Sequence, residues 1–247
     1  PELRDGFSPL NFNRVEVDKI INLTGGDGLI GQNATEAFFK SQVRDQKIIH
    51  LAMHGFVDEK EPLYSGLVFD LPLSEVDGRL GTNSLDQSNL KESELDDGIL
   101  HAYEIYEMEL NAELAVLSAC ETGTGTIKRG EGIISLAHAF KYAGCPNIVM
   151  SLWKVDDEST SELMQFFYSH LKAGKEKDEA LRQAKLDYIK LYPSAPPFYW
   201  APFVLVGDDS PIEFEGFWEK YFITVFLILI VLVVSFLLYR NKSQPTP

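Results

Sequence analysis

The stretch LAVLSACETGTGTIKRGEG, residues 114–132, begins as an apolar run and ends in glycines and threonines, and Cys120 stands where the two parts meet. Continuous apolar runs of this length are typical of strands that are buried on both faces of a parallel sheet. Cys120 is then either one more small residue that closes a buried strand or a thiol that projects from the strand end toward a substrate. The rest of the sequence has to decide between these two roles.

Further apolar runs alternate with helical patterns along the chain. Strands that alternate with helices indicate an α/β fold, and we predict a mostly parallel central sheet flanked by helices. The other predicted strands span residues 47–54, 147–153 and 203–207, and the predicted helices span 34–45, 131–144, 156–174 and 177–193.

Residues 70–98 form a polar segment rich in turn-forming residues. Such a length without apolar periodicity indicates a surface excursion, and we expect a hairpin extension of the sheet.

Length and composition limit the class of protein. The 247 residues suffice for one large α/β domain with a full core or for two small domains. The 37 acidic and 22 basic residues give a net charge of −15, which argues against direct binding of nucleic acid, because that requires a basic face. Two cysteines, Cys120 and Cys145, are too few for a disulfide scaffold, and both fall in predicted core elements. The chain begins with Pro1 and has no signal-peptide pattern, so we expect it to be a piece of a longer protein.

Residues 221–239 are uncharged throughout and, as a helix, would be about 28 Å long, which is enough to span a bilayer. Aromatic residues flank both ends of this segment and basic residues follow it, as in interfacial anchors. We therefore predict a single transmembrane helix over 221–239 that contacts the lipid bilayer, a main domain over 1–210, a linker over 211–220 and a short tail over 240–247. The positive tail predicts a single-pass membrane protein with a cytoplasmic C-terminus and an extracytoplasmic main domain.

Two reactive side chains, His54 and Cys120, fall at the ends of predicted strands. Ligands of open parallel sheets gather outside the carboxyl ends of the strands, and the 66 residues between the two leave room for a crossover that makes them neighbours. An imidazole beside a thiol can take or balance its proton. Gly55 and Gly123 would let a peptide backbone approach and would free backbone N–H groups for an oxyanion. On spacing alone the structural role stays open, since unpaired cysteines are commonly buried and inert.

Five motifs in this order resemble the CHAT family, which consists of caspase-like cysteine peptidases that are related to separases and often fused to tetratricopeptide repeats. The resemblance covers roughly residues 8–208. The motifs are HLAMHG (50–55), LYSGLVF (63–69), LSACETGTG (117–125), GEGIISLAHAFKYAGCPNIVMSLWKVDD (130–157) and FYWAPFVLVGD (198–208).

This resemblance implies a caspase-like sandwich with His54 and Cys120 as a catalytic dyad. Cys120 would attack the scissile carbonyl, His54 would protonate the leaving amine, and the backbone N–H groups of Gly55 and Cys120 would form the oxyanion hole. The cysteine lies in Ser-Ala-Cys-Glu-Thr-Gly rather than in the Gln-Ala-Cys-x-Gly setting of caspases, so caspase specificity for aspartate is not carried over.

Three further residues are candidates for substrate binding. Asp156 and Asp157 follow a predicted strand and could either line a pocket for a basic substrate residue or cap the next helix. Ser65 either lines the cleft or is an ordinary serine at a strand edge.

The sequence therefore predicts a membrane-anchored caspase-like cysteine endopeptidase that cleaves a protein substrate and is controlled by an N-terminal repeat or sensor region. The alternative is a catalytically silent interaction module at the membrane; a third interpretation, an acyltransferase, would share the dyad. We expect no organic cofactor and no metal. His50 and His54 have the i,i+4 spacing of two metal ligands on a helix, but on the predicted strand they would lie about 13 Å apart, too far to share one ion.

Overall fold

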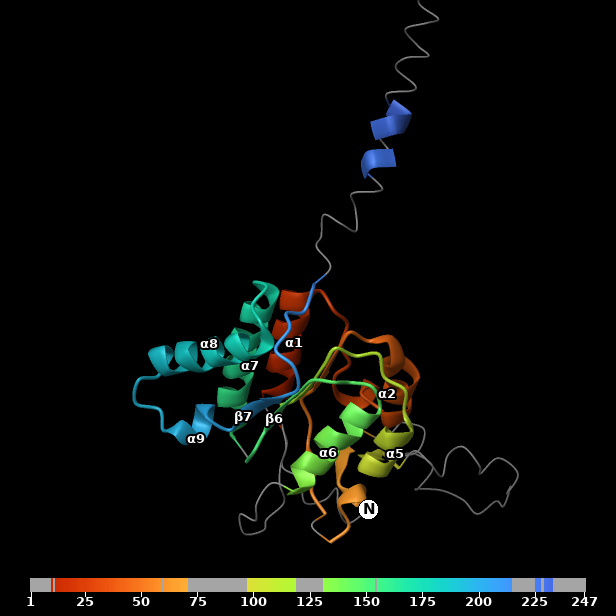
Figure 1. Ribbon diagram of the computed structural model, residues 1–247, viewed down its shortest axis with the longest axis vertical. Helices are drawn as coiled ribbons and strands as arrows, with labels where there is room; N and C mark the ends of the chain where they lie inside the picture. Colours follow the sequence, from red (N-terminus) through yellow and green to blue (C-terminus); the bar gives the residue numbers. More distant parts are fainter. Residues whose placement is uncertain are drawn as a thin grey trace, which may run out of the picture. The chain divides into compact units, whose positions relative to one another are not determined.

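The computed structural model describes residues 10, 12–58, 60–70, 97–118, 131–153, 155–214, 225–227 and 229–232. The chain divides into two compact units, residues 1–212 and residues 213–247. The sheets lie in the first unit (Figure 1).

The larger sheet has four strands in the order β1-β5-β6-β7. β1, β5 and β6 are parallel, and β7 is antiparallel to β6. This confirms the α/β class and the four predicted strands, but the sheet is mixed. The strands are β1 (Ile48–Leu51), β5 (Leu114–Leu117), β6 (Ile148–Ser151) and β7 (Phe203–Val206).

The direction of β7 follows from the two helices between it and β6. α7 (Asp157–Lys172) and α8 (Lys177–Leu191) have similar lengths, are joined by a short turn and pack against each other. One helix carries the chain from the carboxyl end of β6 to its amino end, and the second carries it back. β7 therefore starts at the carboxyl end of the sheet and runs against its neighbour.

Helices cover both faces of this sheet. Figure 1 shows α1, α7 and α8 together at one side and α2, α5 and α6 at the other. Alternate strand residues such as Leu117 and Met150 belong to the core cluster that includes Phe140 of α6, while the side chain of His50 reaches Tyr168 of α7. Burial on both faces explains why these strands read as continuous apolar runs. The remaining helices are α1 (Asn13–Thr24), α2 (Glu36–Gln42), α5 (Ala102–Glu107), α6 (Glu131–Tyr142) and α9 (Pro197–Trp200), with 3-10 turns η2 (Gly31–Asn33), η3 (Val43–Asp45) and η4 (Pro62–Tyr64).

A second, antiparallel sheet was not predicted. It has the order β2-β3-β4 and consists of β2 (Gly55–Phe56), β3 (Gly66–Val68) and β4 (Ile99–His101). β3 and β4 flank the polar segment 70–98, of which residues 71–96 lie outside the described part of the chain. The predicted hairpin extension there stays a prediction.

The predicted transmembrane helix over 221–239 is wrong. Across the described residues, none of the helices has the length and apolar character needed to cross a membrane. The expectations that depended on this helix, namely bilayer contact, a cytoplasmic tail over 240–247 and an extracytoplasmic main domain, are corrected accordingly.

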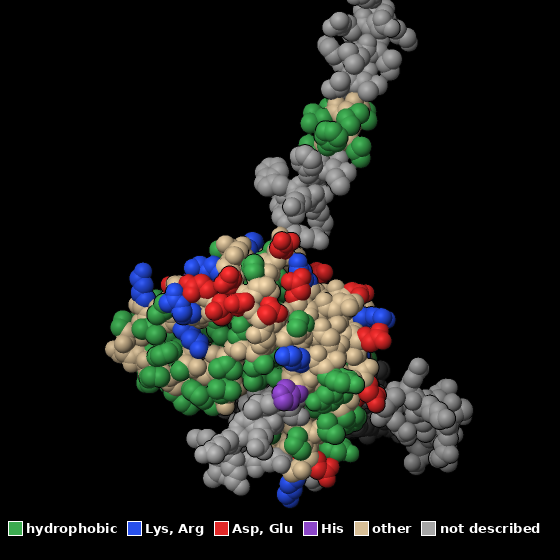
Figure 2. Space-filling model, viewed as in Figure 1, with side chains coloured by type: hydrophobic (Ala, Val, Ile, Leu, Met, Phe, Trp, Pro, Cys, Tyr) green, Lys and Arg blue, Asp and Glu red, His purple; other side chains and the backbone are tan. Residues whose placement is uncertain are grey.

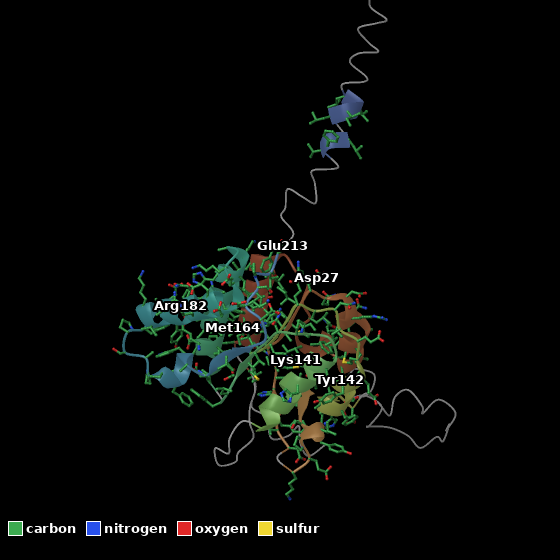
Figure 3. All side chains as sticks on the ribbon, viewed as in Figure 1. Asp27, Lys141, Tyr142, Met164, Arg182 and Glu213 are labelled. Atoms are coloured by element: carbon green, nitrogen blue, oxygen red, sulfur yellow. The ribbon has the colours of Figure 1, made fainter. Side chains whose placement is uncertain are left out.

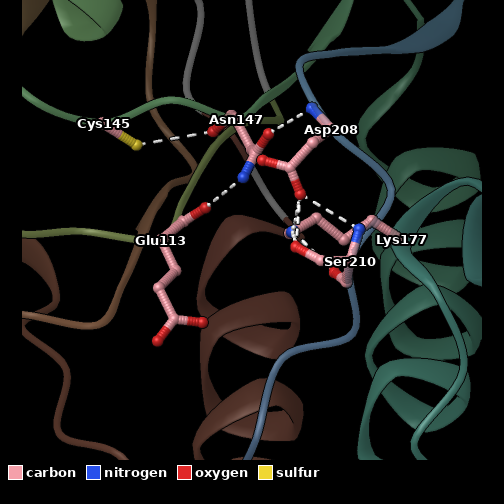
Figure 4. A network of polar contacts seen from close by, with 6 residues as sticks. All are labelled: Glu113, Cys145, Asn147, Lys177, Asp208 and Ser210. Carbon is pink, nitrogen blue, oxygen red and sulfur yellow. Dashed lines mark hydrogen bonds and ion pairs between the residues drawn. The ribbon is translucent and has the colours of Figure 1, made fainter.

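A polar network ties the amino ends of β5 and β6 to the end of β7 (Figure 4). The buried Asn147 donates through Nδ2 to the carbonyl of Glu113 (2.9 Å) and accepts through Oδ1 from the backbone N–H of Asp208 (2.7 Å). The ammonium of Lys177, 1% exposed, contacts Asp208 Oδ1 at 3.2 Å and the carbonyl of Ser210 at 2.6 Å. Hydrogen bonds from Ser210, and then from Asn147 and Lys177, hold the pKa of the Asp208 carboxyl well below its usual range.

Gly207 is the point at which this network tolerates no side chain. Its φ is +138°, and a Cβ there would lie 2.1 Å from Oδ1 of Asn147. We expect Gly207→Ala to lower the free energy of unfolding by about 2–4 kcal/mol, through strain and a broken hydrogen bond, in urea denaturation of the full chain followed by circular dichroism. Gly174→Ala is the matched control, because Gly174 also has a positive φ (+78°) but its Cβ would meet nothing within 4 Å among the described atoms. It should cost only about 1 kcal/mol, and equal losses would contradict this interpretation.

Candidate active site at the carboxyl edge of the sheet

The carboxyl ends of β1, β5 and β6 meet at one edge, and the register of the strands sets what lies there. Leu51 of β1 pairs with Leu117 of β5, and Leu117 pairs with Met150 of β6. The backbone N–H of Ser118 continues the ladder by donating to the carbonyl of Leu51 (3.1 Å). His54 therefore follows the last paired residue of β1 by three positions, as Cys120 follows the last paired residue of β5. Cys120 itself lies outside the described residues.

His54 stands between the two sheets. It follows β1 and directly precedes β2, and its carbonyl accepts a hydrogen bond from the backbone N–H of Val68 (2.8 Å) in β3. The side chain is partly buried. The small sheet thus fixes the backbone of His54 at the edge of the large one, a support that the sequence did not indicate because β2 has only two residues.

Gly55 is buried in β2 opposite Leu67. Antiparallel pairs alternate between hydrogen-bonded and non-hydrogen-bonded types. The N–H of Val68 donates to the carbonyl of His54, so the pair His54–Val68 is hydrogen-bonded and the next pair, Gly55–Leu67, is not. The N–H of Gly55 therefore points away from β3, as a donor to a bound oxyanion must.

Ser65 is fully buried and joins loop to sheet. Its hydroxyl accepts from the backbone N–H of Asp58 (3.0 Å), and its carbonyl accepts from the N–H of Ala102 (2.8 Å). These contacts hold the loop after β2 against the start of α5. These contacts agree with the alternative in which Ser65 is an ordinary serine at a strand edge and does not line the cleft.

Asp156 and Asp157 lie where β6 leads into α7. Asp156 is the N-cap of α7, and its Oδ1 accepts from the N–H of Ser159 (3.1 Å) while its side chain is exposed. Asp157 is the first helical residue and is half-buried. The capping interpretation thus holds for Asp156. An exposed carboxylate that caps a helix can still face a substrate.

The loop between β6 and α7 is anchored on α9. The indole N–H of Trp153 donates to the carbonyl of Phe198 (2.9 Å), and the two rings stack with centroids 6.3 Å apart. Ser151 at the end of β6 donates to the carbonyl of Trp153. The wall of the site at β6 is therefore tied to a segment about 45 residues away, which local sequence patterns do not reveal.

His50 has a structural role. Its Nε2 lies 2.8 Å from Oε1 of Glu16 in α1, and its Nδ1 lies 3.1 Å from the hydroxyl of Tyr168 in α7. Glu16 and Tyr168 are both buried, and burial, followed by the charge of Glu16, raises the pKa of Tyr168 well above its usual value. Through its two ring nitrogens, His50 thus connects α1 and α7 to one face of β1.

Cys145 is a free, buried thiol at the amino end of β6, away from the candidate site. It donates to the carbonyl of Asn147 (3.4 Å). Burial raises its pKa to about 11, although hydrogen bonds to the backbone of Asn147 and Ala115 act in the opposite direction. It therefore stays protonated at neutral pH and is not an activated nucleophile.

Within the part of the chain that the structure describes, one acidic cluster has the spacing of a metal site. Carboxylate atoms of Glu176, Asp178 and Asp209 lie within 4.8 Å of one another, at the amino end of the sheet, and all three residues are exposed. Exposed carboxylates commonly cluster without an ion, and we assign no metal to them.

Comparisons with known proteins place this arrangement in context. A model of the CHAT domain family matches residues 4–208, which confirms the resemblance that the motifs indicated. The chain is similar to tetratricopeptide repeat protein 28 of Mus musculus and of Homo sapiens, each 24% identical over 219 residues. The alignment covers 84% of this chain and 9% of each relative, so the chain spans about a tenth of the length of these curated relatives.

The two cysteines should differ in reactivity. In a Cys120→Ala chain, Cys145 is the sole thiol, and we expect native protein at pH 8 to react with iodoacetamide roughly a hundredfold more slowly than urea-unfolded protein, because burial keeps the thiol protonated. Mass spectrometry over time gives both rates. Similar rates in the native and unfolded forms would contradict the buried position of Cys145.

Proposed function

Because the chain belongs to the CHAT-domain family, we propose that residues 1–210 form a caspase-like cysteine endopeptidase domain, with residues 211–220 as a linker, and that this domain cleaves a protein substrate. Cys120 is the nucleophile and His54 its partner. The observation that carries this proposal is the register of the sheet, in which His54 and Cys120 follow paired residues of adjacent parallel strands by the same three positions.

The chemistry assigned to the dyad is acyl transfer. The Cys120 thiolate attacks the scissile carbonyl and forms a tetrahedral intermediate. His54 protonates the leaving amine, and water then hydrolyses the thioester. The N–H groups of Gly55 and Cys120 stabilise the oxyanion; the geometry of β2, which turns the Gly55 N–H away from β3, supports this role.

Asp156 and Asp157 are proposed to lie beside the substrate residue that precedes the cut. Both follow β6, the strand next to the one that leads to Cys120. Two carboxylates at this place would favour a basic side chain. Asp156 would serve this purpose while it caps α7. Ser65, which is fully buried, would act on substrate binding only through the loop that it holds.

We propose further that an N-terminal tetratricopeptide repeat region in the natural protein controls this activity. This proposal is supported by the name of the relatives, tetratricopeptide repeat protein 28, and by the small share of their length that the chain spans. The same observation favours the second candidate function, a catalytically silent interaction module, since tetratricopeptide repeats stack into extended binding surfaces.

Labelling with activity probes separates the two functions. Peptidyl acyloxymethyl ketones with a basic, acidic or apolar residue next to the reactive group should modify Cys120 in the full chain, and mass spectrometry identifies the site. His54→Ala should slow the reaction at least about 100-fold, because proton transfer is lost, whereas His138→Ala, which removes an exposed histidine of α6, should leave it unchanged. Absence of labelling at Cys120, both in this chain and with the N-terminal region of the natural protein restored, would establish the interaction module instead.

Substitutions at Asp156 separate its two roles. Asp156→Ala removes the cap of α7 and should lower the free energy of unfolding by about 1 kcal/mol, whereas Asp156→Asn keeps a side-chain acceptor and should leave stability nearly unchanged. If the carboxylate also contacts substrate, Asp156→Asn lowers the labelling rate of the basic probe more than that of the apolar one. Equal effects on both probes would restrict Asp156 to capping.

A further inference from the structure

A cavity of about 370 Å³ lies between the first turn of α7, the last turn of α8 and α9. Tyr188, Tyr192 and Tyr199 line it, together with Leu191 and Ser159; Tyr192 and Leu191 are exposed, whereas Tyr188 is buried. Its volume is at the lower end of the range for ligand pockets, which suits one long side chain better than a cofactor. Figure 2 shows hydrophobic side chains gathered over the α8–α9 end of the molecule.

Two of the three tyrosines of this cavity, Tyr188 and Tyr192, are held in place by their hydroxyl groups. Tyr188 donates to Oγ of Ser159 (2.8 Å), and Tyr192 donates to Oε1 of Glu162 (2.7 Å). The two rings have centroids 5.0 Å apart and are tilted by 48°, so they form a corner. The wall between α8 and α9 contains Pro193, Pro196 and Pro197, which restrict its backbone. The aromatic walls are therefore preorganised.

Carboxylates act on two tyrosines of the cavity. Those of Asp156 and Glu162 act on Tyr188, and those of Glu162 and Glu158 act on Tyr192, while Lys190 in the last turn of α8 is exposed. The hydrogen bond to Glu162, followed by burial, raises the pKa of Tyr192 to about 12, and burial, with Asp156 and Glu162, raises that of Tyr188. The ammonium of Lys185 on α8 points elsewhere, donating to the carbonyl of Phe203 in β7 (2.6 Å).

The helix ends add to this field. The carbonyl end of α8 borders the cavity and carries about half a negative charge. The first turn of α7 brings about half a positive charge, and it contains the carboxylates of Asp157 and Glu158. A cation in the cavity would thus lie beside the exposed ring of Tyr192 and close to the carboxylate of Glu162 that this tyrosine contacts.

We propose that this cavity binds the side chain of a lysine or arginine on a partner polypeptide. The exposed ring of Tyr192 takes the alkyl stem and the charged head by cation–π contact, and Glu162, which accepts from the Tyr192 hydroxyl, supplies the opposite charge. This site goes beyond the proposed peptidase function. It requires neither His54 nor Cys120, and binding is expected to be the same in the Cys120→Ala chain.

The probe is a set of blocked pentapeptides, Gly-Gly-X-Gly-Gly, in which X is lysine, arginine, norleucine or glutamate. Saturation-transfer NMR with the full chain at low salt should give binding for lysine and arginine and none for glutamate. Norleucine, which keeps the alkyl stem without the charge, should bind more weakly by about two- to fivefold.

Two substitutions and a control locate the binding. Glu162→Gln keeps an acceptor for Tyr192 and should weaken lysine binding by about two- to fivefold, and Tyr192→Leu should weaken it by a similar factor. Glu179→Gln is the matched control, because Glu179 is also a carboxylate of this helix pair but is engaged by Arg182 on α8 (2.7 Å; Arg182 is labelled in Figure 3). It should leave binding unchanged.

Three results would overturn the proposal. Norleucine that binds as well as lysine would make the cavity a purely apolar site. Lysine binding that is unchanged in both Glu162→Gln and Tyr192→Leu, each verified as folded by circular dichroism, would exclude this cavity as the site. Absence of binding of all four peptides at millimolar concentration would do the same, whatever the outcome of the labelling experiments at Cys120.

Discussion

Parallel pairing of β1, β5 and β6 in a fixed register is the constraint on which the other features of the larger unit depend. Because both faces of these strands are buried, a slip by one residue would move His50 from Glu16 and Tyr168 into the apolar core on the opposite face. The polar contacts of His50 therefore help to select one register. That register brings the residues that directly follow Leu51 and Leu117 to one edge, where His54 lies.

The two ends of the sheet have different chemistry. At the amino end, the polar groups of Asn147, Lys177 and Asp208 bond to one another and to the backbone, and the thiol of Cys145 is buried and protonated. These groups join strands and leave little capacity for a ligand. At the carboxyl end, the N–H of Gly55 points away from β3, and the carboxylate of Asp156 is exposed while it caps α7. Both groups are therefore placed where they could contact a bound ligand. This agrees with the general position of ligand sites in open α/β sheets.

The α7–α8 pair links this edge to the tyrosine cavity. Asp156 caps α7 next to the candidate site, and Ser159, one turn on, accepts from Tyr188 at the cavity. A partner polypeptide held in the cavity would therefore contact the helix whose first residues border the candidate site. Because α7 and α8 also set the direction of β7, one helical hairpin determines the sheet topology and builds the cavity.

The sequence by itself determined the α/β class, the four strands of the larger sheet, the helices over 34–45, 131–144, 156–174 and 177–193 to within a few residues, and the family. Burial on both faces leaves an apolar run, and a helix leaves its period and its caps, so these features are readable locally. The transmembrane helix predicted over 221–239 from apolar composition was wrong, since none of the helices in the described residues is long and apolar enough to cross a membrane. Only the tertiary structure decided the antiparallel direction of β7, the small sheet that holds His54, the network of Asn147 and the tyrosine cavity. Each of these depends on partners that are tens of residues apart, and a local pattern shows that a side chain is buried but does not identify the residue that it contacts.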